Sequence, residues 1–183
     1  MRIGLVGLAG SGKSEVAAVL TGVYGFTRVK FADPLKNMLR TMLSDMGHTA
    51  EDVERYLEGD LKESLVDGLH HLGITARHLM VTLGTEWGRD NLHRDIWLHL
   101  WLARAERFAH VVADDVRFPN EVDAIRQAGG QIWQIIRPGL TAAAHASEQL
   151  VVEADRVIHN TGTLFDLRSI AHQFAQDAGL ACA

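Results

Sequence analysis

The chain has 183 residues, of which 47% are hydrophobic and 22% are charged, and its formal net charge is −5. This length and this balance fit one globular domain with an ordinary core and exclude an intrinsically disordered chain. A free-standing nucleic-acid binder usually carries a basic excess, so polymeric DNA or RNA is not expected as a partner.

The sequence also bounds the redox chemistry and the compartment. Its single cysteine, Cys182, excludes an intramolecular disulfide and a thiolate metal cage. No apolar run approaches the roughly 18 residues of a membrane span, and the N-terminus lacks a signal-peptide pattern. We therefore expect a cytoplasmic protein with no membrane partner.

Short apolar runs alternate along the chain with longer helical patterns. The runs predicted as strands are Ile3–Val6, Phe26–Ala32, His110–Ala113, Gln131–Ile136 and Arg156–His159. The patterns predicted as helices are Val16–Val23, Leu35–Met46, Glu51–Leu57, Thr75–Trp87, Leu92–Phe108, Asn120–Ala128 and Leu164–Phe174. Five strands separated by helices indicate an α/β fold with a five-stranded parallel sheet that is flanked by helices.

The region from residue 50 to residue 109 is predicted to be helical throughout, and it is the one insertion large enough to form a subdomain. Within it, Asp90 or Asn91 is expected to open the last helix. Asp33 is expected to cap the helix that precedes the insertion. An apolar stripe is expected to lie in the core: Trp97, Leu100, Trp101 and Phe108.

The first functional motif follows the first predicted strand and opens a helix. Gly7-Leu-Ala-Gly-Ser-Gly-Lys-Ser14 satisfies the phosphate-loop pattern G-x-x-x-x-G-K-[ST]. Its glycines let main-chain N–H groups and a helix N-terminus converge on phosphate oxygens, while Lys13 suits the β- and γ-phosphates and Ser14 suits Mg²⁺. The residues expected at a nucleoside triphosphate are Ala9, Gly10, Ser11, Gly12, Lys13, Ser14 and Glu15. A glycine-rich turn with an incidental lysine is the alternative.

Two carboxylates end the third predicted strand. Asp114 and Asp115 lie where ligands gather at the carboxyl ends of parallel strands, so they join Ser14 as expected Mg²⁺ ligands. Arg117 follows, and its guanidinium suits bidentate capture of a phosphate. The alternatives are an aspartate that only caps a turn and an Arg117 that pairs with Glu121 at the surface.

Seven segments in family order make a resemblance specific: Gly7–Ser14, Phe31–Lys36, Gly84–Arg89, Asp115–Glu121, Ile136–Pro138, His145–Glu148 and Asp155 to Asn160. On these segments the sequence resembles the bacteriophage deoxynucleoside monophosphate kinases, a branch of the P-loop nucleoside monophosphate kinases. The resemblance spans residues 3 to about 167. It implies a P-loop core over 1–35 and 108–183, a helical monophosphate-binding insertion over about 36–107 and a lid over about 138–152.

The resemblance also implies an activity. It is the transfer of a phosphoryl group from ATP, with Mg²⁺, to a small-molecule (deoxy)nucleoside 5′-monophosphate, for phage DNA precursor synthesis in the host cytoplasm. The implied catalytic residues are Lys13, Arg89, Asp115, Arg117 and Arg137. The implied substrate-binding residues are Asp33, Lys36, Arg89, Asp115, Arg117, Glu121 and Glu148. Asn160 would lie near the adenine, and the protein would be a monomer or a homodimer.

Several alternatives stay open at this stage. Asp33 would then only cap its helix, Lys36 would be solvated and Asn160 would end a strand. For the activity, the alternatives are another small-molecule P-loop kinase, such as a dephospho-coenzyme A-like kinase, and a non-catalytic nucleotide-binding module.

Overall fold

A computed structural model describes residues 1–140 and 152–182. The chain divides into two units, which are described separately: Met1–Phe31 with Trp101–Ala183, and Ala32–Leu100. None of the helices in the described ranges combines the length and the hydropathy needed to cross a lipid bilayer.

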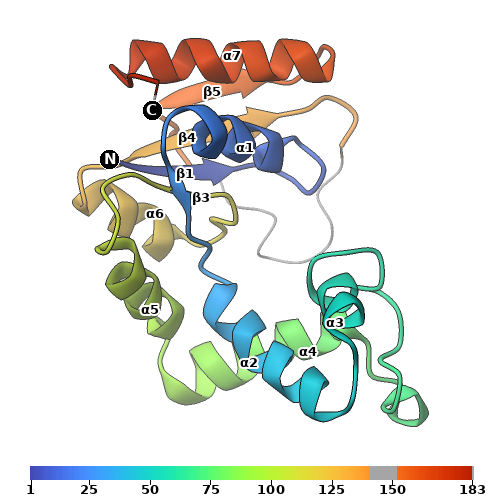
Figure 1. The fold of residues 1–183 in the computed structure, drawn as a ribbon. Coiled ribbons are helices and arrows are strands. Elements are labelled where there is room, and N and C mark those ends of the chain that lie inside the picture. Colours follow the sequence, from blue (N-terminus) through green and yellow to red (C-terminus); the bar gives the residue numbers. More distant parts are fainter. Residues whose placement is uncertain (141–151, 183) are drawn as a thin grey trace. The chain divides into compact units, whose positions relative to one another are not determined.

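The first unit is built on a five-stranded sheet in the order β2-β3-β1-β4-β5, in which every pair of neighbours is parallel (Figure 1). The strands are β1 (Arg2–Val6), β2 (Thr27–Arg28), β3 (Val111–Ala113), β4 (Gln131–Ile136) and β5 (Arg156–His159). This confirms the predicted fold class. Because β1 is central, its carboxyl end delivers the phosphate loop to the middle of the sheet.

The second strand is much shorter than the predicted run Phe26–Ala32. It is an edge strand that pairs only with β3, with Thr27 beside Val111 and Arg28 beside Val112. Phe26, Val29 and Phe31 are nevertheless buried, which explains why the run reads as apolar.

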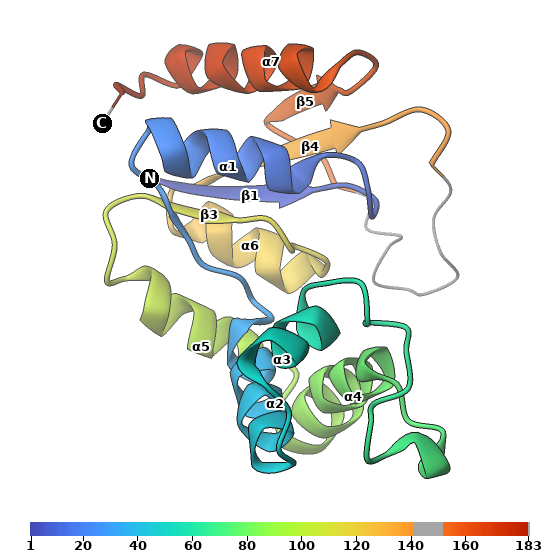
Figure 2. The same ribbon diagram turned by 45° about the vertical axis from the view of Figure 1, so that its right-hand side comes forward.

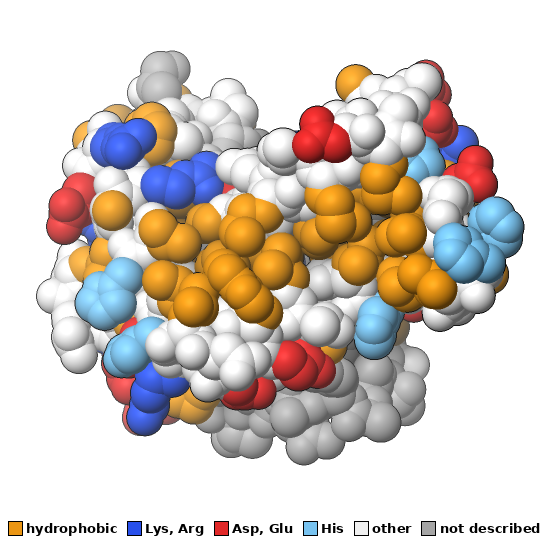
Figure 3. Space-filling model, turned by 90° about the horizontal axis from the view of Figure 1, so that it is seen from below, with side chains coloured by type: hydrophobic (Ala, Val, Ile, Leu, Met, Phe, Trp, Pro, Cys, Tyr) orange, Lys and Arg blue, Asp and Glu red, His pale blue; other side chains and the backbone are white. Residues whose placement is uncertain are grey.

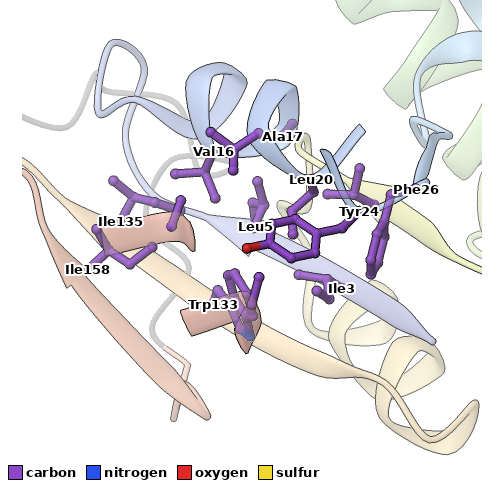
Figure 4. Close-up of a cluster of buried hydrophobic side chains, with 14 of the residues drawn as sticks. Ile3, Leu5, Val16, Ala17, Leu20, Tyr24, Phe26, Trp133, Ile135 and Ile158 are labelled. Atoms are coloured by element: carbon purple, nitrogen blue, oxygen red, sulfur yellow. The ribbon is translucent and has the colours of Figure 1, made fainter. Parts of the chain in front are cut away.

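Helices cover both faces of this sheet (Figure 2). On one face α1 (Lys13–Val23) and α7 (Leu164–Asp177) pack against each other, and α6 (Pro119–Gln127) covers the other face. Figure 4 shows apolar side chains of α1 facing those of the strands, among them Val16, Leu20, Leu5, Trp133 and Ile158. This core fixes the start of α1, and with it the phosphate loop, against the sheet.

The second unit is helical. It contains α2 (Asp33–Asp45), α3 (Ala50–Leu57), a short 3-10 helix (His70–Leu72), α4 (Ala76–Thr82), a π-helix (Leu83–Leu92) and the first half of α5 (Ile96–Ala105). Its core comprises Leu35, Leu39, Leu43, Val53, Tyr56, Leu57, Val66, Ala76 and Trp97. The expected cap is wrong by one position, because Asp33 is the first residue inside α2 and Ala32 takes the capping position without a side-chain hydrogen bond.

The π-helix overturns the prediction that Asp90 or Asn91 opens the last helix of this region. Trp97 Nε1 donates to Gly84 O at 2.7 Å, and its ring covers Gly88 so closely that a Cβ there would lie 2.4 Å from Trp97 Cζ2. Trp97 thus packs closely along the π-helix, a geometry that is rare in proteins and has no signature in a helical periodicity. The helix therefore continues through Asp90 and Asn91 as a π-helix, and α5 begins only at Ile96.

The apolar stripe expected to be core is buried only in part. Trp97 and Trp101 are buried, whereas Leu100 and Phe108 are each 40% exposed. Figure 3 shows hydrophobic side chains gathered on one face of the molecule. The exposed large hydrophobic residues of the second unit are Met38, Met46, Leu65, Leu72, Trp87, Leu92 and Leu100.

Candidate active site

The loop between β1 and α1 has a backbone that only glycine accommodates. Gly7, Gly10 and Gly12 have φ angles of 147°, 76° and 109°. A Cβ on Gly7 would lie 2.4 Å from Ile135 O, and a Cβ on Gly12 would lie 2.7 Å from Leu167 Cδ2. The loop is therefore held against β4 and α7 in a shape that larger residues would disrupt.

Two cationic side chains rest on the carbonyl groups of this loop. Lys13 Nζ donates to Gly7 O at 2.6 Å and to Leu8 O at 2.8 Å. Arg137 Nη1 donates to Gly10 O at 3.2 Å. Neutral carbonyls are weaker partners for a cation than phosphate oxygens, so an arriving polyphosphate would compete well for both side chains.

A pocket of about 350 Å³ opens beside the loop. It is lined by Gly10, Gly12, Lys13, Ser14, Glu15, Arg137, Asn160, Gly162, Leu164 and Leu167. Seven of these ten residues belong to the set predicted from the sequence, and the leucines give the pocket an apolar side. The described part of the fold thus gathers most of the expected triphosphate residues, together with Arg137, around one cavity of ligand size.

Among the residues expected at the triphosphate, the side chains of Asn160 and Glu15 have structural partners in the described part of the chain, whereas that of Ser11 has none there. Asn160 Nδ2 donates to Ser11 O at 2.9 Å, which ties the carboxyl end of β5 to the phosphate loop. Glu15 Oε2 accepts from Arg168 Nη2 at 2.7 Å. The hydroxyl of Ser11 is buried and, among the described residues, has no hydrogen-bond partner. Direct nucleotide contacts of these three side chains stay predictions.

The two carboxylates after β3 have separate partners. Asp114 is only 6% exposed, and its Oδ2 accepts from Ser14 Oγ at 3.4 Å. Asp115 Oδ1 instead accepts from the main-chain N–H of Phe31 at 3.0 Å, where β2 leads into the second unit. Of the expected magnesium ligands, Asp114 is therefore the carboxylate beside Ser14, and Asp115 anchors a connecting segment.

Arg28 completes this cluster. Its Nε donates to Asp114 Oδ1 at 2.8 Å, its Nη2 pairs with Asp114 Oδ2, and Nη2 also donates to Ser14 Oγ at 3.2 Å. Arg28 was not predicted as a site residue from the sequence. The signal that could have indicated it is a cation within the apolar run that contains β2, the strand next to β3.

Arg117 is exposed on the segment that leads from β3 into α6. Its main-chain N–H donates to Glu121 Oε2 at 2.8 Å, and the N–H of Phe118 donates to the same oxygen at 3.2 Å. Glu121 itself is only 2% exposed. This burial argues against the direct substrate contact predicted for Glu121, whose carboxylate serves the first turn of α6 and the backbone of Arg117.

The second unit holds the other predicted substrate residues. Lys36, predicted to be either a ligand or solvated, is 9% exposed, and its Nζ donates to Glu58 Oε1 at 2.7 Å. Arg89 lies in the π-helix, where its Nη1 donates to Arg94 O at 3.1 Å. Asp33 occupies the first turn of α2. Glu58 was not singled out, because an ion pair across two helices leaves no spacing pattern in the sequence.

The remaining predicted residues lie outside the described ranges. Glu148 and most of the lid expected over about 138–152 fall between residues 141 and 151. Arg137, at the start of that lid, is described and reaches the phosphate loop.

The donor atoms at the loop fit Mg²⁺. In the described ranges, no three His, Cys, Asp or Glu side chains cluster to hold a metal ion. Mg²⁺ needs no such cage, because it prefers hard oxygen ligands and binds through one or two protein groups together with phosphates and water. Ser14 Oγ and the buried carboxylate of Asp114, only 3.4 Å apart, provide such groups beside the pocket.

Comparisons with known proteins agree on one family. The family profile for deoxynucleotide monophosphate kinase matches residues 64–170. A protein of Acanthamoeba polyphaga mimivirus that is assigned to the deoxynucleotide monophosphate kinases is 34% identical, with 91% of this chain and 92% of that protein covered. The deoxynucleoside-5′-monophosphate kinase of Escherichia phage T5 is 37% identical over 40% of this chain and 31% of its own length.

The solved structures reflect the fold alone. Shikimate kinase from Aquifex aeolicus superposes with a TM-score of 0.50 at 13% sequence identity, and the match covers 97% of this chain and 98% of that chain. The fold of this chain is therefore similar to one found at low sequence identity over nearly its whole length.

Proposed function

This chain belongs to the deoxynucleotide monophosphate kinase family, and from that premise we propose that it transfers the γ-phosphoryl group of ATP to a (deoxy)nucleoside 5′-monophosphate. The products are ADP and the nucleoside diphosphate, which viral DNA synthesis requires as a precursor. The observation that carries the proposal is the meeting of Lys13, Ser14 and Asp114 beside a pocket of about 350 Å³.

On the donor side, the phosphate loop supplies main-chain N–H groups and the N-terminus of α1 for the phosphates of ATP. Lys13 would leave its two carbonyl partners for the β- and γ-phosphates, and Arg137 would leave Gly10 O in the same way. The apolar side of the pocket at Leu164 and Leu167 suits the adenine ring, with Asn160 at its edge.

Mg²⁺ would be held by Ser14 and Asp114, and when bound it neutralises charge on the transferring phosphates. Asp114 is suited to this because its burial keeps water from screening the charge of the carboxylate. Asp115, which accepts from the N–H of Phe31, would hold the segment that follows β2 close to this cluster.

The acceptor needs no protein base. The second pKa of a phosphate monoester is about 6, so the attacking oxygen is already largely deprotonated at neutral pH. The remaining task is to bring two anions together, and guanidinium groups suit it. We assign Arg117 of the first unit to the acceptor phosphate. Within the second unit, Arg89, Lys36 and Asp33 are the residues we propose for substrate binding.

The test is a coupled assay of ADP release with ATP, Mg²⁺ and a panel of ribo- and deoxynucleoside monophosphates. We expect at least one deoxynucleoside monophosphate to support turnover, and Lys13→Met to lower kcat by about a thousandfold without unfolding the protein. Turnover that no monophosphate stimulates, or full activity of Lys13→Met, would contradict the proposal. A chain that binds ATP without any turnover would be a binding module instead.

A further inference from the structure

The guanidinium group of Arg28 contacts both side chains that are proposed to hold the metal ion, Asp114 and Ser14. Arg28 reaches Asp114 with two nitrogens, Nε on Oδ1 at 2.8 Å and Nη2 on Oδ2. The same Nη2 donates to Ser14 Oγ at 3.2 Å. One nitrogen of Arg28 is thus within hydrogen-bond distance of both oxygens, Asp114 Oδ2 and Ser14 Oγ.

The sheet produces this placement directly. Arg28 pairs in register with Val112, two residues before Asp114 on the neighbouring strand. Its side chain therefore runs along the carboxyl end of β3 toward the start of α1. The flanking backbone is fixed, because Val29 N donates to Val112 O at 3.0 Å and Val29 O accepts from the buried indole of Trp101 at 2.8 Å.

The charges explain why such a group is needed. The side chain of Asp114 is 5% exposed and that of Arg28 is 35% exposed. A carboxylate buried to this degree is costly to keep ionised without a compensating cation. Arg28 supplies that cation, and a guanidinium does not lose its charge at accessible pH.

The same geometry prevents Arg28 and a metal ion from being ligated together. Mg²⁺ contacts its oxygen ligands at about 2.0–2.1 Å and requires nearly octahedral space around itself. The Nη2 group occupies the region from which a cation would reach Asp114 Oδ2 and Ser14 Oγ. Two positive groups on the same pair of oxygens would also repel each other strongly in a partly buried site.

We propose that Arg28 is a built-in counter-ion, which holds the metal position in the free enzyme and must leave Asp114 and Ser14 before Mg²⁺ binds there. The inference rests on the proposed function, since it takes Ser14 and Asp114 as the metal ligands. Arg28 then lowers the affinity of the site for a metal ion, and the phosphates of the nucleotide provide the additional ligands that make the exchange favourable.

The test measures metal affinity without turnover. Mn²⁺ serves as the probe, and its binding to the enzyme–ADP complex is followed by electron paramagnetic resonance. We expect Arg28→Gln to bind Mn²⁺ about tenfold more tightly than the wild type, because it removes the competitor and keeps Asp114 and Ser14. Asp114→Asn should bind Mn²⁺ much more weakly than either.

A matched control separates competition from a general change in charge. Arg156→Gln removes the same charge from an arginine of the same unit that also pairs with a carboxylate, Asp177. It should change Mn²⁺ affinity by no more than about twofold, because neither Arg156 nor Asp177 belongs to the pocket or to the proposed metal ligands. An equal gain in both variants would reduce the effect of Arg28 to net charge and overturn the inference.

The other outcomes are equally decisive. Weaker Mn²⁺ binding by Arg28→Gln would mean that Arg28 orients Asp114 for the metal, and unchanged binding would mean that it never competes; both overturn the inference. If Arg28→Gln does not fold, Arg28→Lys takes its place. It keeps the charge but loses the two-nitrogen fork, so we expect a smaller gain in affinity, and no gain would again overturn the inference.

The failure of the proposed function would look different. Absence of turnover with every monophosphate contradicts the kinase reaction, whereas the Mn²⁺ measurement requires only ADP and gives its answer without an acceptor.

Discussion

The two units of this protein hold their charged side chains in different ways. In the first unit, several charged groups near the carboxyl edge of the sheet are bound to main-chain atoms: Lys13 to loop carbonyls, Arg137 to Gly10 O and Glu121 to two N–H groups. In the second unit, Lys36 pairs with Glu58 and Arg40 pairs with Glu54, both across α2 and α3.

The difference indicates different roles. A cation that rests on carbonyls exchanges them for a phosphate at little cost, because the carbonyls are easily solvated when it leaves. Two side chains of opposite charge neutralise each other, and pulling one away leaves its partner without compensation. We therefore infer that the cations resting on main-chain carbonyls in the first unit serve the reaction, and that the Arg40–Glu54 pair of the second unit mainly joins its helices.

Arg117→Ala is the strongest test of this division. The side chain is exposed and its backbone is held by Glu121, so its loss should leave the midpoint of thermal unfolding within about 2 °C of the wild type. If Arg117 contacts the transferring phosphoryl or the acceptor phosphate, kcat should fall by about a thousandfold. Steady-state kinetics and calorimetry on the same preparation measure both quantities. Normal turnover of the folded variant would remove Arg117 from the mechanism.

Glu121 offers the opposite case in the first unit, a charged group whose effect should be on stability. In Glu121→Ala the N–H groups of Arg117 and Phe118 lose their acceptor, at a cost of about 3 kcal/mol. For a chain of this length, that lowers the midpoint of thermal unfolding by about 10 °C.

Glu121→Gln is the matched variant. It keeps an acceptor oxygen of the same reach and should therefore lose only about 1 kcal/mol. Two variants of equal, wild-type stability would show that the start of α6 does not depend on this carboxylate, and Arg117 would then need another explanation for its position.

The sequence predicted the parts of this fold that local patterns specify. The sheet and the phosphate loop follow from periodicity and from a short motif, respectively. The sequence also predicted two carboxylates at the end of the third strand, and the structure separates Asp114 beside Ser14 from Asp115 beside Phe31.

The features that sequence reasoning missed depend on contacts between distant segments. The π-helix lies against Trp97, which donates to the carbonyl of Gly84 and covers Gly88, and periodicity does not record this contact. Arg28 meets Asp114 only because β2 and β3 are neighbours in register. The resemblance implied a substrate role for Glu121, which stays a prediction, and the structure adds a main-chain role that the motif did not indicate.

The exposed pair of the second unit should give the smallest effect. Arg40 Nη2 donates to Glu54 Oε2 at 3.0 Å, and the carboxylate is 51% exposed, so Arg40→Gln should cost less than about 1 kcal/mol of unfolding free energy at pH 7. The hydrogen bond from Arg40 lowers the pKa of Glu54 below its ordinary value of 4.5. The stabilisation is thus fully present above that value and is lost as pH falls through the lowered pKa.

Urea unfolding of wild type, Arg40→Gln, Glu54→Gln and the double variant at pH 7 and near pH 4 measures the coupling between the two side chains. A coupling that stays constant into acid, or that exceeds the cost of Glu121→Ala, would mean that the second unit depends on its ion pairs as heavily as the first depends on its main-chain contacts.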